Sequence, residues 1–185
     1  MDELAMENYA LQLSDQAYVS MPGAFSRTAN FTVEMWVQPT SVDPFSPSDT
    51  VPHGLQRHCE LTVGSEGSLY FLLAQRGGLQ LSSASTGPTA LLDGDWHHIA
   101  VVRSAAGTSI TIYMDGADLI TATAQPASLS TSYPIQLGYS YLQGQSLVAT
   151  YLSGGFDEVR MWSVALTSMQ IQLFLGVVCH YEFLR

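Results

Sequence analysis

Hydrophobic and polar residues alternate along most of this chain with the two-residue period of β-strands. The clearest case is a pair of alternating segments, Trp96–Arg103 and Ser109–Met114, on either side of the turn-forming residues 104–108. The dipeptide Asp115-Gly116 then supplies the next reversal, because Asp and Gly tolerate the left-handed backbone of a tight hairpin turn. Strand side chains lie alternately on the two faces, so the pattern predicts antiparallel strands joined by hairpins.

The same alternation predicts strands along the rest of the chain, and a different pattern near its end predicts one helix. The further strands are expected at 8–13, 17–21, 31–37, 58–64, 68–75, 79–84, 119–124, 135–137, 148–152 and 156–162. The first two are expected to form an opening hairpin or a pair of short strands. The helix is expected at Thr167–Leu175, where Thr167 is a suitable N-cap for an apolar stripe.

Three predicted connections stand out from the strands. Residues 38–57 hold four of the eight prolines and are expected to form a long loop, the turn 64–67 joins two strands, and residues 138–146 form a loop rich in Tyr, Gln and Gly. Long loops on a rigid scaffold often carry function, although 38–57 could also be a disordered insertion.

Several of these segments resemble one known family. Gly94–Ala100 and Ile112–Gly116 resemble the central strands of laminin-G-like jelly rolls, within the concanavalin A-like lectin/glucanase superfamily that also includes pentraxins. The order of the other matching motifs agrees: Tyr9–Leu13, Phe31–Val37, Gly155–Trp162 and Ala165–Thr167.

The resemblance implies an all-β fold: a two-sheet antiparallel jelly-roll β-sandwich with one short C-terminal helix, formed as a single domain over residues 1–185. The tail 176–184 resembles a final strand of this family, which would pair near the N-terminal strand. The fold itself does not decide function, because it is shared by lectins, adhesion modules and glycosidases.

The composition narrows the choice of partner. Charged residues make up 12% of the chain, against about 25% in an average protein, and the net charge is −10 with no lysine. Phosphate backbones and anionic lipid surfaces would repel such a chain, so neither nucleic acid nor a membrane is an expected partner. A surface covered by Ser, Thr, Gln and Tyr instead suits neutral, hydroxyl-rich ligands.

One group of residues has the chemistry of a sugar site. Sugar sites combine an aromatic platform with amide and hydroxyl hydrogen bonds. These side chains are concentrated near the loop 138–147, as Tyr139, Tyr141, Gln143, Gln145 and Tyr151. The alternative is that the tyrosines only close the edge of the sandwich.

Three residues from the other loops complete the expected site. Arg57 and His58 lie at the end of the loop 38–58 and could donate hydrogen bonds to a ligand, although each could equally be solvated surface. Glu66 lies in the turn that corresponds to one calcium-binding loop of pentraxins. The second such loop, within 138–154, contains no acid here, so a pentraxin-type double calcium site is not expected.

Asp157 and Asp115 are the candidates for a single structural calcium, because wider relatives carry one near an aspartate at a strand end. Alternatively, Asp115 only forms its turn and Asp157 only accepts backbone hydrogen bonds. His97 and His98 are adjacent strand residues on opposite faces, so they cannot chelate one zinc ion, and we expect them to serve in packing. No cofactor is required by this reading.

These observations favour a carbohydrate-binding, lectin-like protein that recognises neutral glycans or glycoproteins through loops at one end of the sandwich. The alternative is a protein–protein adhesion or assembly module that uses the same loops or an edge strand. An enzyme is not expected, because a glycosidase of this fold needs closely spaced carboxylates on a strand. A homo-oligomer is compatible with lectin multivalency.

The first residues, Met1–Glu7, carry acids where a secretory signal needs a basic start and an apolar run. The sequence leaves the compartment open, and a cytoplasmic or a non-classically secreted protein is compatible with these residues. Cys59 and Cys179 are 120 positions apart, and the sequence leaves open whether they pair.

Overall fold

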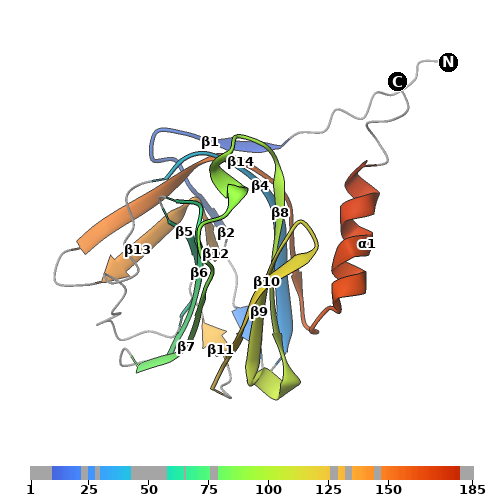
Figure 1. Ribbon diagram of the computed structural model, residues 1–185. Helices are drawn as coiled ribbons and strands as arrows, with labels where there is room; N and C mark the ends of the chain where they lie inside the picture. The colour runs from blue at the N-terminus through green and yellow to red at the C-terminus, as the bar shows by residue number, and fades with distance from the viewer. Residues whose placement is uncertain are drawn as a thin grey trace.

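Two layers of antiparallel strands form the fold (Figure 1). The structure is a computed structural model that describes residues 10–21, 25–27, 30–42, 58–64, 66–75, 79–125, 129–131, 135–143 and 147–179. The larger layer is a seven-stranded sheet in the order β1-β14-β4-β8-β9-β10, with β13 also paired to β14. Its strands are β1 (Leu11–Leu13), β4 (Phe31–Val42), β8 (His97–Ser104), β9 (Ser109–Met114), β10 (Ala117–Thr123), β13 (Tyr139–Gln143) and β14 (Leu147–Trp162).

The facing layer consists of three smaller sheets. One has the order β5-β6-β7, and the other two are the pairs β3 with β11 and β2 with β12. The bounds are β2 (Val19–Met21), β3 (Phe25–Arg27), β5 (His58–Val63), β6 (Leu69–Gln75), β7 (Leu79–Ser85), β11 (Leu129–Thr131) and β12 (Ile135–Leu137). Short 3₁₀ turns occur at η2 (Ala90–Leu92) and η3 (Ala105–Gly107). This architecture confirms the predicted antiparallel β-sandwich.

The main core lies between the two layers and follows the alternation in the sequence. On β4, Phe31 and Val37 are buried and Val33 and Met35 pack against the same cluster. Phe71 of β6 meets Phe31 from the opposite layer, with ring centroids 6.4 Å apart. Burial of these apolar faces removes them from water and holds the layers together.

A second, smaller core lies on the outer face of the larger sheet, beneath the helix α1 (Ser168–Cys179). Figure 1 shows α1 on the side of this sheet away from the facing layer. Ile171 is buried against Ala100 and Val102 of β8, and Phe174 stacks on Trp162 with centroids 5.3 Å apart. The larger sheet is therefore covered on both faces over its central strands.

The predicted N-cap of this helix is confirmed. The Thr167 Oγ1 accepts the N–H of Gln170 at 3.3 Å, and the Gln170 Oε1 accepts the N–H of Thr167 at 2.9 Å. This reciprocal pair is a capping box, which satisfies two N–H groups that the first helical turn leaves without partners.

Thr32 of β4 connects the sheet to the turn that precedes α1. Its fully buried hydroxyl donates to the Val164 carbonyl at 3.0 Å and accepts the N–H of Leu166 at 2.9 Å. One side chain thus satisfies a donor and an acceptor of the turn and positions the start of the helix.

Of the two alternatives predicted for the opening of the chain, the structure has the pair of short strands and not the hairpin. The chain does turn at Ser14–Ala17, but β1 pairs with β14 and β2 pairs with β12. The two strands therefore belong to different layers. Leu13 is buried in the core at the point where the chain leaves the larger sheet.

Three other boundaries also differ from the prediction. Residues 38–42 extend β4 instead of opening the long loop, of which 43–57 lie outside the described residues. Residues 139–143, predicted as a loop, form β13, because the backbone of β14 supplies hydrogen-bond partners there. Residues 176–179, predicted as the start of a final strand, are the last turn of α1, and 180–185 lie outside the described residues.

The segments 148–152 and 156–162, predicted as separate strands, are one strand, β14, which contains two register shifts. Gly154 allows the strand to continue, because it adopts a φ of 146° and lies against the backbone of Gln38, where a Cβ would collide. Within the described part of the chain, no helix is long and apolar enough to cross a membrane.

The Thr32 contacts predict a specific loss of stability. In Thr32→Val the buried N–H of Leu166 and the carbonyl of Val164 lose their partner, which should cost about 1–3 kcal/mol. Thr123→Val, at an exposed position of β10, is the matched control. Urea unfolding measures both variants, and equal stabilities would contradict the role given to Thr32.

Candidate functional site

Three tyrosine positions of the predicted sugar site, 139, 141 and 151, lie on a two-stranded ribbon formed by β13 and the first half of β14. In this ribbon Tyr139 lies opposite Tyr151, and Tyr141 lies opposite Ala149. Residues directly opposite each other, and residues two apart on one strand, share a face. Positions 139, 141, 143 and 151 therefore all belong to one face of the ribbon.

This face points away from the core. Leu152, the neighbour of Tyr151 on β14, packs against the main core. Side chains alternate along a strand, and no register shift separates these two residues. Tyr151 consequently lies on the outer face, where it is half-buried.

The remaining predicted ligand-binding residues lie elsewhere or outside the described chain. Glu66 is exposed in the turn between β5 and β6, where its carbonyl accepts the N–H of Thr89 at 3.4 Å. His58 begins β5 opposite Ala74 and so belongs to a strand. Arg57 and Gln145 lie outside the described residues.

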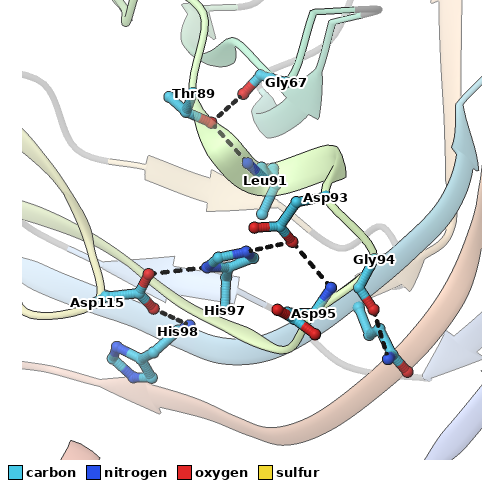
Figure 2. A network of polar contacts seen from close by, with 10 residues as sticks. Gly67, Thr89, Leu91, Asp93, Gly94, Asp95, His97, His98 and Asp115 are labelled. Carbon is cyan, nitrogen blue, oxygen red and sulfur yellow. Dashed lines mark hydrogen bonds and ion pairs between the residues drawn. The ribbon is translucent and has the colours of Figure 1, made fainter.

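His97 forms a polar network that the sequence did not reveal (Figure 2). Its Nδ1 lies 2.8 Å from Asp115 Oδ2, and its Nε2 lies 3.0 Å from Asp93 Oδ1. Asp115 follows β9 and Asp93 follows η2, so one imidazole joins two separate turns at the start of β8. Adjacency to His98 suggested packing alone. Asp93 is only four residues away from His97, but the sequence gives no signal that Asp115, 18 residues away, contacts the same ring.

The electrostatics of this network favour the charged imidazole. Burial of His97 opposes protonation, but its hydrogen bonds and ion pairs with Asp115 and Asp93 outweigh burial and raise its pKa. The N–H of Asp95 and the ring of His97 lower the pKa of Asp93. Because both ring nitrogens face a carboxylate, the imidazolium can donate both of its hydrogen bonds.

The two candidate calcium ligands both have other hydrogen-bonding roles. Asp115 contacts His97 through Oδ2 and accepts the N–H of His98 at Oδ1, at 2.9 Å. Asp157 accepts the N–H of Glu158 at 2.8 Å. Among the described residues, no three His, Cys, Asp or Glu side chains lie close enough together to hold a metal ion. A structural calcium stays a prediction.

A second polar group lies on the outer face of the larger sheet. Glu34 is fully buried, where its Oε1 accepts the Trp162 N–H at 3.0 Å and lies 3.5 Å from Arg160 Nη1. Its Oε2 lies 3.5 Å from His98 Nε2, an ion contact too long for a well-formed hydrogen bond. Burial favours the neutral acid, but His98, Trp162 and Arg160 together hold the pKa of Glu34 below its ordinary value.

The contacts of this polar group join several elements of the fold. Arg160 also pairs with Glu158 and lies 5.5 Å over the Phe174 ring of α1, so the group is partly covered by the helix. Trp36 contacts His98 edge to face at 5.5 Å. These contacts connect β4, β8, β14 and α1.

Comparison with known families agrees with this architecture. The model of a family described as the concanavalin A-like lectin/glucanases superfamily matches residues 13–172. The chain belongs to this superfamily. No curated protein matches it in sequence.

Three solved structures with a similar fold share less than 20% sequence identity with this chain. The binding domain of Paraclostridial Mosquitocidal Protein 1 has a TM-score of 0.62 at 14% identity, over 91% of this chain and 43% of that one. The present chain therefore spans less than half the length of that structure. At such identities the similarity shows the fold alone.

Two domains that were solved with bound sugars are similar over nearly the whole chain. The CBM40 of Ruminococcus gnavus IT-sialidase, solved with α2,3 sialyllactose, has a TM-score of 0.59 at 13% identity, over 91% of this chain and 97% of that one. Domain 4 of the arabinanase AbnA from Geobacillus stearothermophilus, solved with arabinotriose, has a TM-score of 0.58 at 16% identity, over 90% and 76%.

The His97 network predicts a pH-dependent stability. The pKa of histidine in an unfolded chain is about 6.5. Because the pKa of His97 is raised on folding, its stabilisation is complete below about pH 6.5 and is lost as the pH rises through the folded-state value. His97→Gln should destabilise by about 1 kcal/mol near pH 6, discounted for the exposure of both aspartates, and should remove this part of the pH dependence.

Urea unfolding between about pH 5.5 and 9 measures this difference. The other histidines are present in both proteins, so the difference between the two pH profiles isolates His97. Parallel profiles for the wild type and the variant would contradict the network described above.

Proposed function

We propose that this chain is a non-catalytic carbohydrate-binding module that recognises neutral glycans on the outer face of the β13–β14 ribbon. The observation that carries the proposal is the strand register, which assigns positions 139, 141 and 151 to one face, with 143 beside them. A sugar ring would stack on the tyrosines at these positions, and Gln143 and the tyrosine hydroxyls would hydrogen-bond its hydroxyl groups.

The outward direction of this face supports the proposal. Tyrosines that only closed the edge of the sandwich would belong to the side of the ribbon that meets the core. The side that includes Leu152 meets the core instead, and Tyr151 is on the opposite side. The ribbon therefore presents its three tyrosine positions outward from the sandwich.

The preference for neutral glycans rests on charge. The two sugar-bound domains described above were solved with an acidic sugar, sialyllactose, and with arabinotriose, so the fold itself accepts both kinds of ligand. This chain has a net charge of −10, and residues 138–154, which include most of the ribbon, contain neither acid nor base. Sialylated glycans would meet an anionic protein with no cation on the ribbon, whereas neutral glycans would not be repelled.

The same stretch supports binding without hydrolysis. Retaining and inverting glycosidases both place two carboxyl groups around the scissile bond. Residues 138–154 contain no carboxylate, so a glycan on this face would have no acid or nucleophile from the ribbon itself. The absence of acids in this stretch also argues against sugar binding through calcium, since calcium prefers several carboxylate oxygens.

Removal of the aromatic platform tests this function. Tyr139→Ala and Tyr141→Ala should each weaken binding of a neutral oligosaccharide at least about tenfold, which corresponds to about 1.4 kcal/mol, while Tyr141→Phe should keep most of the affinity because the stacking ring remains. Isothermal titration with a ligand selected on a glycan array, with and without EDTA, measures these affinities.

Met169→Ala is the control, since it removes an exposed apolar side chain from α1, which Figure 1 shows on the far side of the molecule from β13. Wild-type affinity in both alanine variants would reject the platform. A preference for sialylated glycans would reject the assignment of neutral ligands, and binding abolished by EDTA would reject the metal-free mode. Binding of proteins without glycans, and of no sugar, would favour the adhesion module.

A further inference from the structure

The outer face of β14 continues past the tyrosine ribbon into the second half of the strand. Leu152 and Phe156, four residues apart, both pack in the main core. The register shift between them adds one residue to β4 and leaves the count on β14 unchanged. Side chains alternate along a strand, so positions 151, 153, 155 and 157 all belong to the outer face.

Trp96 and Gln12 lie together over Gly155 on this outer face. A Cβ on Gly155 would lie 2.5 Å from the ring of Trp96 and 2.8 Å from the Nε2 of Gln12. Gln12 is directly opposite Gly155 on β1 and is exposed, and Trp96 is half-buried. The absence of a side chain at this glycine therefore leaves room for an indole ring and an amide group at the surface.

The next outer position adds a carboxylate and a second indole. Asp157 lies directly opposite Trp36 of β4. Trp36 is half-buried and its Nε1 is fully buried, so the exposed part of this side chain is carbon. Asp157 accepts the N–H of Glu158 with Oδ1, and among the described residues its Oδ2 has no hydrogen-bond partner. One carboxylate oxygen is thus available as an acceptor.

The helix α1 lies over a neighbouring part of the same sheet. Its buried contacts are to Ala100 and Val102 of β8, and it also packs on Trp162 at the end of β14. In the strand order, β14 and β4 lie between β1 and β8, so Gln12 and Gly155 are on the side of the sheet away from these contacts. We use the name outer track for the outer face of 151–157 together with the side chains of Gln12, Trp36 and Trp96.

The outer track repeats the chemistry proposed for the ribbon. Apolar ring surface, an amide and a carboxylate oxygen are groups that stack on sugars and bind their hydroxyls. Tyr151 and Gly155, which lies beneath Trp96, are four residues apart on one strand, at most about 13 Å. A single sugar ring is too short to contact both aromatic groups, whereas a linear chain of sugars can.

The charges along the track favour a neutral chain. Asp157 is the one charged residue among 151–157. The nearest base on the strand, Arg160, is already paired with Glu34 and Glu158. A sugar carboxylate on the track would therefore be repelled by Asp157 with no free cation from β14 beside it, whereas neutral hydroxyls can donate to this aspartate.

We propose that the outer track extends the ribbon site, and that its ligand is a linear neutral oligosaccharide lying along β14. One part of the chain stacks on the tyrosines and another on Trp96, with hydrogen bonds to Gln12 and Asp157. This inference rests on the function proposed for the ribbon and specifies the ligand as the interior of a sugar chain. A module for a single terminal sugar would need the ribbon alone.

Chain length is the first test. The probes are the mono-, tri- and hexasaccharides of linear neutral polysaccharides presented on a glycan array, with cellulose, mannan and arabinan chains included. In isothermal titration the hexasaccharide should bind at least about tenfold more tightly than the monosaccharide, because only the longer chain contacts both aromatic groups at once. A saturating hexasaccharide should also change the tryptophan emission, since the tryptophans all lie outside the ribbon, at 36, 96 and 162.

Variants of the track are the second test. Trp96→Ala should remove the gain in affinity with chain length. Gln12→Ala should weaken binding of the hexasaccharide about threefold to tenfold and leave that of the monosaccharide unchanged, because it removes one hydrogen bond from the track only. Gln136→Ala, at an exposed glutamine on β12 of the facing layer, is the matched control. Circular dichroism and urea unfolding establish that each variant is folded, and the exposed Gln12 decides the test if Trp96→Ala does not fold.

The outcomes separate this inference from the function of the ribbon. Equal affinities for the monosaccharide and the hexasaccharide, an unchanged tryptophan emission at saturation, or a full gain with chain length in both track variants would each overturn the track and leave the ribbon site standing. Loss of binding in the track variants, with wild-type affinity in Tyr139→Ala and Tyr141→Ala, would reject the ribbon and with it a ligand that spans both. Binding of no neutral sugar would reject both proposals.

Discussion

The use of both faces of β4 is the constraint on which the rest of this fold depends. Phe31, Val33, Met35 and Val37 bury one face in the main core. The alternate residues Thr32 and Glu34 are fully buried on the other face, where they hold the turn before α1 and the Trp162 indole. Because the side-chain period is two, a slip of one residue would exchange the apolar and polar sets, so both cores depend on a single register.

The polar residues of this second face need hydrogen-bonding or charged partners, which apolar packing does not need. A carboxylate buried as deeply as Glu34 is destabilising unless charged and hydrogen-bonding groups surround it. Arg160, Trp162 and His98 supply these groups from two different strands, and Phe174 of α1 covers Arg160. The helix therefore covers part of a polar cluster as well as the apolar cluster on which Ile171 packs.

The sequence predicted features that depend on local pattern and missed those that depend on distant contacts. Strands β8 and β9 and the Asp115-Gly116 turn follow from alternation and turn chemistry within a few residues. The Thr167 cap follows from a residue type suited to an N-cap directly before an apolar stripe. β14 appeared as two strands because Gly154-Gly155 resembles a break. Its continuity depends on the Gln38 backbone and the Trp96 ring, which lie against these glycines from far along the chain. The pairing of β1 with β14, and of His97 with Asp115, has the same long-range origin.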